Sequence, residues 1–199
     1  MILTNTEIEK IMADFLLEHS DELECKLCGY EDRVCREGEK HPKIFIVNEG
    51  VFRISKLDMP NRDATVGFCF KPDIITPIII NDDYASLFEI KSIENNLSKY
   101  NSIYEIPIEQ WNYFAEKNEK LKLVHLSVIH NNLTQMINLF SILRQNRNTK
   151  NILYRIYKMN HPILNSGIPD KYLADFFGLT LNTFHKIIYK IIKNENSNY

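Results

Sequence analysis

Two stretches near the C-terminus carry apolar residues at intervals of three and four, the spacing of a buried helical face. The first stretch, residues 169–177, opens with Pro169, which suits an initial helical turn. Gly178 can adopt the left-handed backbone that ends a helix, and Thr180 is a good N-cap for a second helix that runs to Lys193. Two short helices separated by a glycine turn predict a helix-turn-helix.

The second of these helices is predicted to have one buried and one exposed face. The apolar residues that we expect to be buried are Phe184, Ile187, Ile188 and Ile191. The opposite face presents amides, hydroxyls and cations, groups that can enter a DNA major groove, at Asn182, Thr183, His185, Lys186, Tyr189 and Lys190. A helical hairpin that only packs against the rest of the chain is the simpler alternative.

The N-terminal half begins with another helical pattern and then changes to strand-like runs. A helix is expected over residues 4–19, because Thr4 and Glu7 have the spacing of a capping box. Short apolar runs separated by turn residues then recur at 43–47, 51–55, 65–70, 74–80, 86–93 and 102–106. The sequence Asn48-Glu49-Gly50 between two of these runs is typical of a hairpin. This rhythm predicts an antiparallel barrel or jelly roll.

A long helix with two apolar stripes is predicted over residues 118–145, after a shorter helical pattern that Pro107 opens. One stripe repeats every seven positions in two series offset by three, the pattern of a helix that pairs with a second copy of itself, at Leu126, Ile129, Leu133, Met136, Phe140 and Leu143. The other stripe could pack on the barrel and consists of Leu121, Val124, Val128 and Ile137. We favour a dimer helix, because a helix that is apolar on two sides needs two partners. The alternative is that both stripes face one intramolecular core.

These patterns predict an α+β protein with an N-terminal antiparallel β-roll (a jelly roll), a long dimerisation helix and a C-terminal helix-turn-helix. We place the β-roll sensor domain at residues 1–117, the dimerisation helix at 118–146 and the DNA-binding domain at 147–199. Residues 147–199 contain eight Lys and Arg against three Asp and Glu, a net charge of +5, whereas the remainder carries −7. A basic end on an acidic body suits contact with phosphates.

The composition also bears on compartment and chemistry. No apolar run reaches the roughly 18 residues of a membrane span, and the N-terminus lacks the basic-then-apolar pattern of an export signal. Four cysteines in such a chain suggest reduced thiols, so we expect a cytoplasmic protein. The common nucleotide-binding loops and hydrolase motifs are missing from the sequence. We therefore expect a protein that is not an enzyme and that needs no cofactor and no metal.

The order of helix, β-roll, long helix and helix-turn-helix resembles the CRP/FNR superfamily of bacterial transcription regulators. Four stretches carry the resemblance, at 34–39, 44–53, 67–75 and 168–193, and together they extend it over nearly the whole chain. The resemblance implies a homodimer that reads a palindromic operator in double-stranded DNA. It also implies a small-molecule effector that acts through the roll, and RNA polymerase as a partner.

The roll departs from the members of this superfamily that bind cyclic nucleotides. Those members have a Gly-Glu pair for the ribose and an arginine with Ser or Thr for the cyclic phosphate. Here the matching stretch, 74–79, has neither Gly nor Glu, and no arginine occurs between Arg62 and Arg144. A buried phosphodiester needs a fixed cation, so we expect a degenerate or differently liganded roll, although Lys91 or Lys99 could substitute.

The recognition helix also departs from the family pattern. Matched position by position, the serine and arginine of the family fall on His185 and Lys186, and its next arginine falls on Ile188. We expect base contacts from Asn182, Thr183, His185 and Lys186. The expected phosphate contacts come from Lys171, Lys186, Lys190 and Lys193, and Thr180 and Tyr189 complete the predicted DNA-binding set.

The cysteines leave another interpretation open. One branch of the superfamily holds an iron–sulfur cluster through three N-terminal cysteines and one in the roll, and this chain has Cys25, Cys28, Cys35 and Cys69. Residues three apart on a strand point to opposite faces, so Cys25 and Cys28 converge only if the strand breaks. We expect ordinary thiols. The alternatives are an iron–sulfur, zinc or thiol redox sensor, and a ligand-binding roll with a vestigial helix-turn-helix that acts through protein partners.

Overall fold

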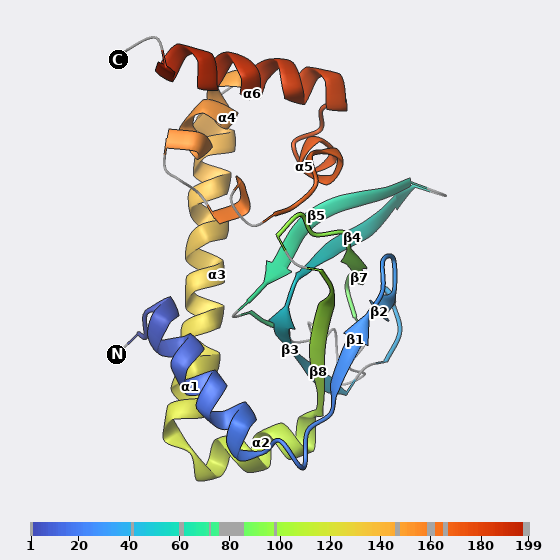
Figure 1. Cartoon of the computed structure of the whole chain (residues 1–199), viewed down its shortest axis with the longest axis vertical. Coiled ribbons are helices and arrows are strands. Elements are labelled where there is room, and N and C mark those ends of the chain that lie inside the picture. The colour runs from blue at the N-terminus through green and yellow to red at the C-terminus, as the bar shows by residue number, and fades with distance from the viewer. Residues whose placement is uncertain are drawn as a thin grey trace.

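The structure, a computed structural model, describes residues 2–40, 42–59, 62–71, 73–75, 86–97, 99–145, 148–158, 162–164 and 167–196. Its N-terminal part contains α1 (Asn5–Glu18), β1 (Cys25–Cys28), β2 (Arg33–Cys35), β3 (Lys43–Glu49), β4 (Val51–Met59), β5 (Arg62–Phe70), β6 (Ile74–Ile75), β7 (Glu89–Ile93) and β8 (Asn101–Pro107). The helices that follow are α2 (Ile108–Lys117), α3 (Glu119–Gln145), α4 (Thr149–Lys158), α5 (Asp170–Phe176) and α6 (Leu181–Asn196), with a short 3-10 turn at Pro162–Leu164. The long helix α3 runs beside the roll, with α1 and α2 at one end and α4 and α6 at the other (Figure 1).

The described strands form two four-stranded antiparallel sheets, in the orders β1-β8-β3-β6 and β2-β7-β4-β5. The predicted α+β class and antiparallel roll are confirmed. The hairpin predicted at Asn48-Glu49-Gly50 is wrong, because β3 and β4 belong to different sheets. The chain crosses from one sheet to the other at this point, and β4 pairs instead with β5 and β7.

A buried asparagine joins the two sheets at this crossing. Asn101, at the start of β8, accepts a hydrogen bond from the Val51 N–H at 3.0 Å through its side-chain oxygen. Its amide nitrogen donates to the Ser92 hydroxyl at 2.6 Å and to the Ile93 carbonyl at 2.7 Å. Gly50 has a φ of +87°, and a Cβ there would lie 1.7 Å from the Asn101 side-chain oxygen. The crossing therefore requires glycine for two independent reasons.

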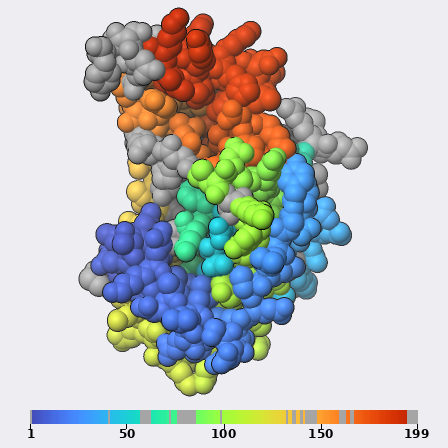
Figure 2. Space-filling model, in the orientation of Figure 1, coloured from blue at the N-terminus to red at the C-terminus, as the bar shows by residue number. Residues whose placement is uncertain are grey.

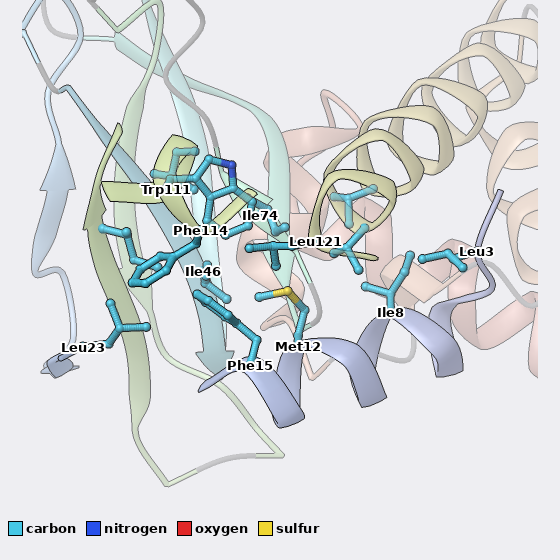
Figure 3. Close-up of a cluster of buried hydrophobic side chains, with 14 residues drawn as sticks. Leu3, Ile8, Met12, Phe15, Leu23, Ile46, Ile74, Trp111, Phe114 and Leu121 are labelled. Carbon is cyan, nitrogen blue, oxygen red and sulfur yellow. The ribbon is translucent and has the colours of Figure 1, made fainter. Parts of the chain in front are cut away.

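One hydrophobic core packs the first three helices onto the outer face of the sheet that contains β3 and β8. Helix α1 is capped at Thr4 by the predicted capping box with Glu7. Its buried face contributes Ile8, Met12 and Phe15 to the core. Around these side chains lie Trp111 and Phe114 of α2 and Leu121 of α3 (Figure 3). The apolar faces predicted from the helical period thus pack three helices as one layer against a sheet.

The two stripes of α3 have different surroundings. Leu121, Val124 and Val128 are buried in this core, as predicted, whereas Ile137 is 66 % exposed and its assignment to the same packed stripe is wrong. Ile137 lies more than two turns beyond Val128, past the end of the described contacts with α1 and α2. Of the predicted seam, Leu126, Ile129 and Leu133 are exposed, and the side chains of Met136, Phe140 and Leu143 lie outside the described residues.

The interior of the roll is a second hydrophobic cluster. Two aromatic rings, Phe45 and Phe52, are fully buried in it. The remaining members are aliphatic side chains and three thiols, namely Val34, Val47, Ile54, Ile75, Ile90, Ile103, Cys28, Cys35 and Cys69. No charged side chain belongs to this cluster in the described part of the roll.

None of the helices in the described part of the chain combines the length and the hydropathy that crossing a bilayer requires.

We predict that Gly50→Ala is much more destabilising than Gly38→Ala. Both glycines have positive φ, but Gly38 has open space around the missing Cβ whereas Gly50 abuts Asn101. We expect a loss of about 1 kcal/mol in the free energy of unfolding for Gly38→Ala, from backbone strain alone, and about 3 kcal/mol or more for Gly50→Ala. Urea unfolding of both variants measures the difference, and equal losses would contradict the proposed role of the Asn101 contact.

Candidate nucleic-acid interface

The turn between α5 and α6 is built as the sequence predicts. Gly178 has a φ of +65°, and its N–H donates to the Asp175 carbonyl at 2.9 Å while the Leu179 N–H donates to the Ala174 carbonyl at 2.8 Å. Thr180 caps α6, because its hydroxyl accepts from the Thr183 N–H at 3.3 Å. These bonds satisfy the free backbone groups at the two facing helix ends. They fix the angle between α5 and α6.

The inner face of α6 belongs to a third hydrophobic cluster. Phe184 and Ile191 are each 2 % exposed, and Ile187 and Ile188 are half-buried beside them, as predicted. Their neighbours in the cluster come from α4 and α5, including Ile152, Leu153, Ile156, Tyr172 and Leu173. Ile188 therefore contributes to the core of the helix-turn-helix.

The outer face of α6 is exposed at every position that the sequence predicts to contact DNA: Asn182, Thr183, His185, Lys186, Tyr189 and Lys190. Lys186, Lys190 and Lys193 lie at i, i+4 and i+7, so their side chains follow one line along the helix. The helix lies across one end of the molecule, away from α1 and α2 (Figure 2). This placement leaves a cationic helix face accessible.

Some of the predicted contact residues already have partners within the protein. His185 Nε2 lies 2.8 Å from Asp170 Oδ2, which connects α6 to the first turn of α5. The Thr180 and Thr183 hydroxyls are 2.9 Å apart. Within the described part of the chain, Asn182, Lys186, Tyr189 and Lys190 make no hydrogen bond or ion pair through their side chains. These four are the side chains that are free to contact a ligand.

Lys171 differs from the other predicted phosphate contacts, because it points toward the roll. Its ammonium group donates to the Tyr30 hydroxyl at 3.0 Å and lies over the rings of Tyr30 and Tyr172. The hydrogen bond to Tyr30 raises the pKa of Lys171. In this arrangement Lys171 helps to hold α5 against the roll.

The same helix carries further contacts to the roll that the sequence does not reveal. The Tyr172 hydroxyl donates to Glu31 at 2.9 Å and lies 3.1 Å from the Tyr30 hydroxyl. Burial raises the pKa of Tyr172. Asp175 reaches β4 and β5, where its carboxylate accepts hydrogen bonds from Arg53 and Thr65. Nothing in the local pattern marks Asp175, because its partners lie 122 and 110 residues away.

The described interior of the roll presents no buried cation to a cyclic phosphate. Lys91 pairs with Glu89 and lies 3.9 Å from Asp63, and Lys99 is exposed. In the stretch 74–79, which differs in sequence from the cyclic-nucleotide-binding pattern, Ile74 and Ile75 are buried. Residues 76–79 lie outside the described residues. No charged side chain is fully buried among the described residues, so the described interior lacks the fixed cation that a buried phosphodiester needs.

A cleft outside the roll interior lies between α1 and strands β3 and β8. It measures about 310 Å³, and its apolar lining includes Met12, Leu16 and Ile46. Asn48, Lys71 and Tyr104 add polar groups to the lining. The cleft lies beside α1, whereas α6 lies across one end of the molecule (Figure 1).

The four cysteines do not converge. Cys25 is exposed, whereas Cys28, Cys35 and Cys69 are buried. Burial raises the pKa of all three buried thiols, most strongly that of Cys69. No group of three or more metal-ligating side chains comes together among the described residues.

Solved structures similar to this one are regulators of the CRP/FNR type. FixK2 from Bradyrhizobium japonicum has a TM-score of 0.66 at 12% identity, with 87% of this chain and 86% of that chain covered. CLP, the c-di-GMP-responsive global regulator of Xanthomonas campestris, has a TM-score of 0.65 at 12% identity, with 92% and 93% covered. A cyclic nucleotide-binding domain protein from Listeria monocytogenes has a TM-score of 0.68 at 14% identity, with 95% and 92% covered.

Comparison of the sequence alone identifies no related protein. No protein-family model matches the chain, and no curated protein matches it. At 12 to 14% identity the likeness shows the fold alone. The fold is that of the CRP/FNR regulators, from the N-terminal helix to the helix-turn-helix.

We predict that Cys25 reacts with a disulfide reagent at least about 10-fold faster than the other three thiols, because the thiolate is the reactive form and burial suppresses it elsewhere. One rapid equivalent out of four is expected in the native protein, and Cys25→Ser should remove it. Rapid reaction of Cys28, Cys35 or Cys69 in the folded protein would favour the redox-sensor interpretation.

Proposed function

We propose that this protein is a DNA-binding transcription regulator that acts as a homodimer and reads a palindromic operator. The observation that carries the proposal is the exposed polar and cationic face of α6, at one end of a CRP/FNR-type fold. The first turns of such a helix can lie in a major groove while its lysines contact phosphates. The proposed role is regulatory and involves no catalysis.

The exposed face divides into base-reading and phosphate-binding groups. Asn182 and Thr183 supply hydrogen-bonding groups for base edges near the start of α6, and Lys186 can reach either a base or a phosphate. Asp170 holds the His185 ring at 2.8 Å, so it orients this imidazole before DNA arrives. Lys190 and Lys193 continue along the backbone of the DNA.

The dimer is proposed to form along α3. Leu126 is 61 % exposed and Leu133 is 53 % exposed. Ile129, which belongs to the second seven-residue series, lies between them and is also exposed. Exposed leucines at this spacing pair favourably with those of a second copy. A two-fold axis along α3 would present two recognition helices, and successive major grooves on one side of DNA are about 34 Å apart.

The input to the proposed regulator differs from a buried cyclic nucleotide. CLP is described as responsive to c-di-GMP, and the Listeria protein contains a cyclic nucleotide-binding domain. In this chain the fully buried side chains that the structure describes include no cation, so we propose a different effector. RNA polymerase is the proposed partner on DNA.

We predict that Lys186→Ala lowers affinity for operator DNA by about 3- to 10-fold and reduces the slope of log affinity against log salt by about 2, one phosphate contact for each protomer. Lys10→Ala is the matched control, because Lys10 is an exposed lysine of α1 at the opposite end of the molecule. Fluorescence anisotropy at several salt concentrations measures both quantities. An unchanged affinity and slope for Lys186→Ala would remove this residue from the interface.

We predict that Leu133→Glu converts the dimer into a monomer. Glutamates facing each other across the seam would leave two charges in an apolar interface, which costs several kcal/mol. Leu17→Glu is the control, because Leu17 is 77 % exposed on α1 and lies outside the seam. Sedimentation equilibrium distinguishes the two states, and a Leu133→Glu dimer as tight as wild type would place the interface elsewhere.

A further inference from the structure

The carboxylate of Asp175 lies among hydrogen-bond donors on the outer face of the roll. Its Oδ2 atom accepts from the Thr65 backbone N–H at 3.1 Å and from Arg53 Nη2 at 3.3 Å. The Thr65 hydroxyl donates to the same oxygen. A guanidinium, a backbone N–H and a hydroxyl that converge on one oxygen form the type of site that binds an oxyanion. We call this set of donors the Arg53–Thr65 cradle.

The cradle is held in place by the roll itself. The guanidinium of Arg53 donates to the Asp63 carboxylate at 2.7 Å and to the Asp63 carbonyl at 3.1 Å. Its Nε donates to the Thr65 hydroxyl at 2.7 Å, which leaves the hydroxyl proton of Thr65 for the anion. The Arg53 side chain is only 11 % exposed. All of these bonds join β4 to β5, so the cradle does not depend on α5 for its shape.

A buried hydroxyl without a hydrogen-bond partner lies next to the cradle. Ser55 is the register partner of Thr65, which puts the two side chains on one face of the sheet. Ser55 is 1 % exposed, and its hydroxyl has no hydrogen-bond partner among the described residues.

The charges linked to the cradle by ion pairs are those of Arg33, Arg53 and Lys91 against those of Asp63, Glu89 and Asp175. Without Asp175 this network has one positive charge in excess. A single negative charge therefore complements the cradle, and in the folded chain Asp175 supplies it.

We propose that the Arg53–Thr65 cradle is a binding site for a small oxyanion, and that Asp175 occupies it as an intramolecular ligand. A dissolved carboxylate or phosphate would compete with α5 for the same donors. Occupation of the cradle by the dissolved ion would weaken the attachment of the helix-turn-helix to the roll. The site thus gives the protein a small anionic effector that binds outside the roll interior.

The competition has a physical limit that sets the expected affinity. Apolar side chains also attach α5 to the roll, including Phe68 of β5 and Phe176 of α5, whose ring centroids are 5.7 Å apart. An intramolecular ligand of this kind has an effective concentration in the millimolar range or above. The free ion is therefore expected to act on the wild-type protein at roughly 10 to 100 mM, and to bind more tightly when Asp175 is removed.

The consequence for DNA rests on the proposed function. Undocking of α5 would release Lys171 from Tyr30 and let α6 change its position relative to α3. DNA affinity is therefore expected to change by about 3-fold or more when the cradle is occupied by the free ion. Anion binding can be measured without DNA, so a negative result for anion binding is distinguishable from a negative result for DNA binding.

The first experiment uses Asp175→Ala in the full chain, with Asp170→Ala as a control that removes another carboxylate of α5. Thermal unfolding is followed in acetate, in phosphate and in chloride at equal ionic strength. Acetate or phosphate should raise the midpoint of Asp175→Ala by about 2 to 4 °C in a saturable manner, with little effect on Asp170→Ala. The acetate and phosphate arms show which class of oxyanion the cradle prefers.

A second substitution tests the cradle directly. Arg53→Lys added to Asp175→Ala replaces the guanidinium by a point charge and should abolish the anion response. A response that persists in the double variant, or no response of Asp175→Ala to either ion, would overturn the site.

The wild-type protein provides a measurement that does not depend on a variant that folds. Amide hydrogen exchange in residues 170–176 should become at least about 3-fold faster in 100 mM phosphate than in chloride at the same ionic strength. Unchanged exchange would overturn the competition. Faster exchange with unchanged DNA affinity would overturn only the regulatory role, and absence of DNA binding under every condition would instead refute the proposed function.

Discussion

The long helix α3 connects the core that contains α1 and α2 to the opposite end of the molecule, where it contacts α4. Its first half is buried against α1, α2 and the sheet that contains β3 and β8, through Leu121, Val124 and Val128. At about 1.5 Å per residue, its 27 residues extend roughly 40 Å, beyond the roll. The far end then carries α4 to α6, so α6 is positioned by a helix that is anchored in another hydrophobic core. The same anchoring leaves Leu126, Ile129 and Leu133 exposed.

A second connection between the two ends runs through α5. The third hydrophobic cluster includes Val51 and Ile93 of the roll as well as the buried residues of the helix-turn-helix. Asp175, Tyr172 and Lys171 add polar bonds between the same surfaces. The helix-turn-helix is thus attached both by α3 and by the roll. The contacts of α5 with the roll connect the roll to α6 without passing through α3.

Much of the fold follows from local sequence patterns, because each pattern reflects contacts close in the chain. The capping box at Thr4, the bounds of α3 and the glycine turn at Gly178 are confirmed, since each depends on residues within one or two helical turns. The hairpin at Gly50 is wrong for the opposite reason. The local sequence shows that the chain reverses but does not show which strands pair, and here Asn101, about 50 residues away, defines the crossing. The role of Asp175 could not be predicted for the same reason, because its partner Thr65 lies 110 residues away in the sequence. The exposure of the α6 face, by contrast, follows from the helical period alone.

Selection from a pool of random duplex DNA tests the central claim most directly. Purified protein is incubated with the pool, and the retained DNA is sequenced after several rounds. We predict a palindromic consensus whose two half-sites are about one helical turn apart, because one recognition helix of each protomer in the proposed dimer enters a major groove. Failure to enrich any sequence, with and without phosphate or acetate present, would contradict the account. In that case the exposed face of α6 would have to serve a protein partner.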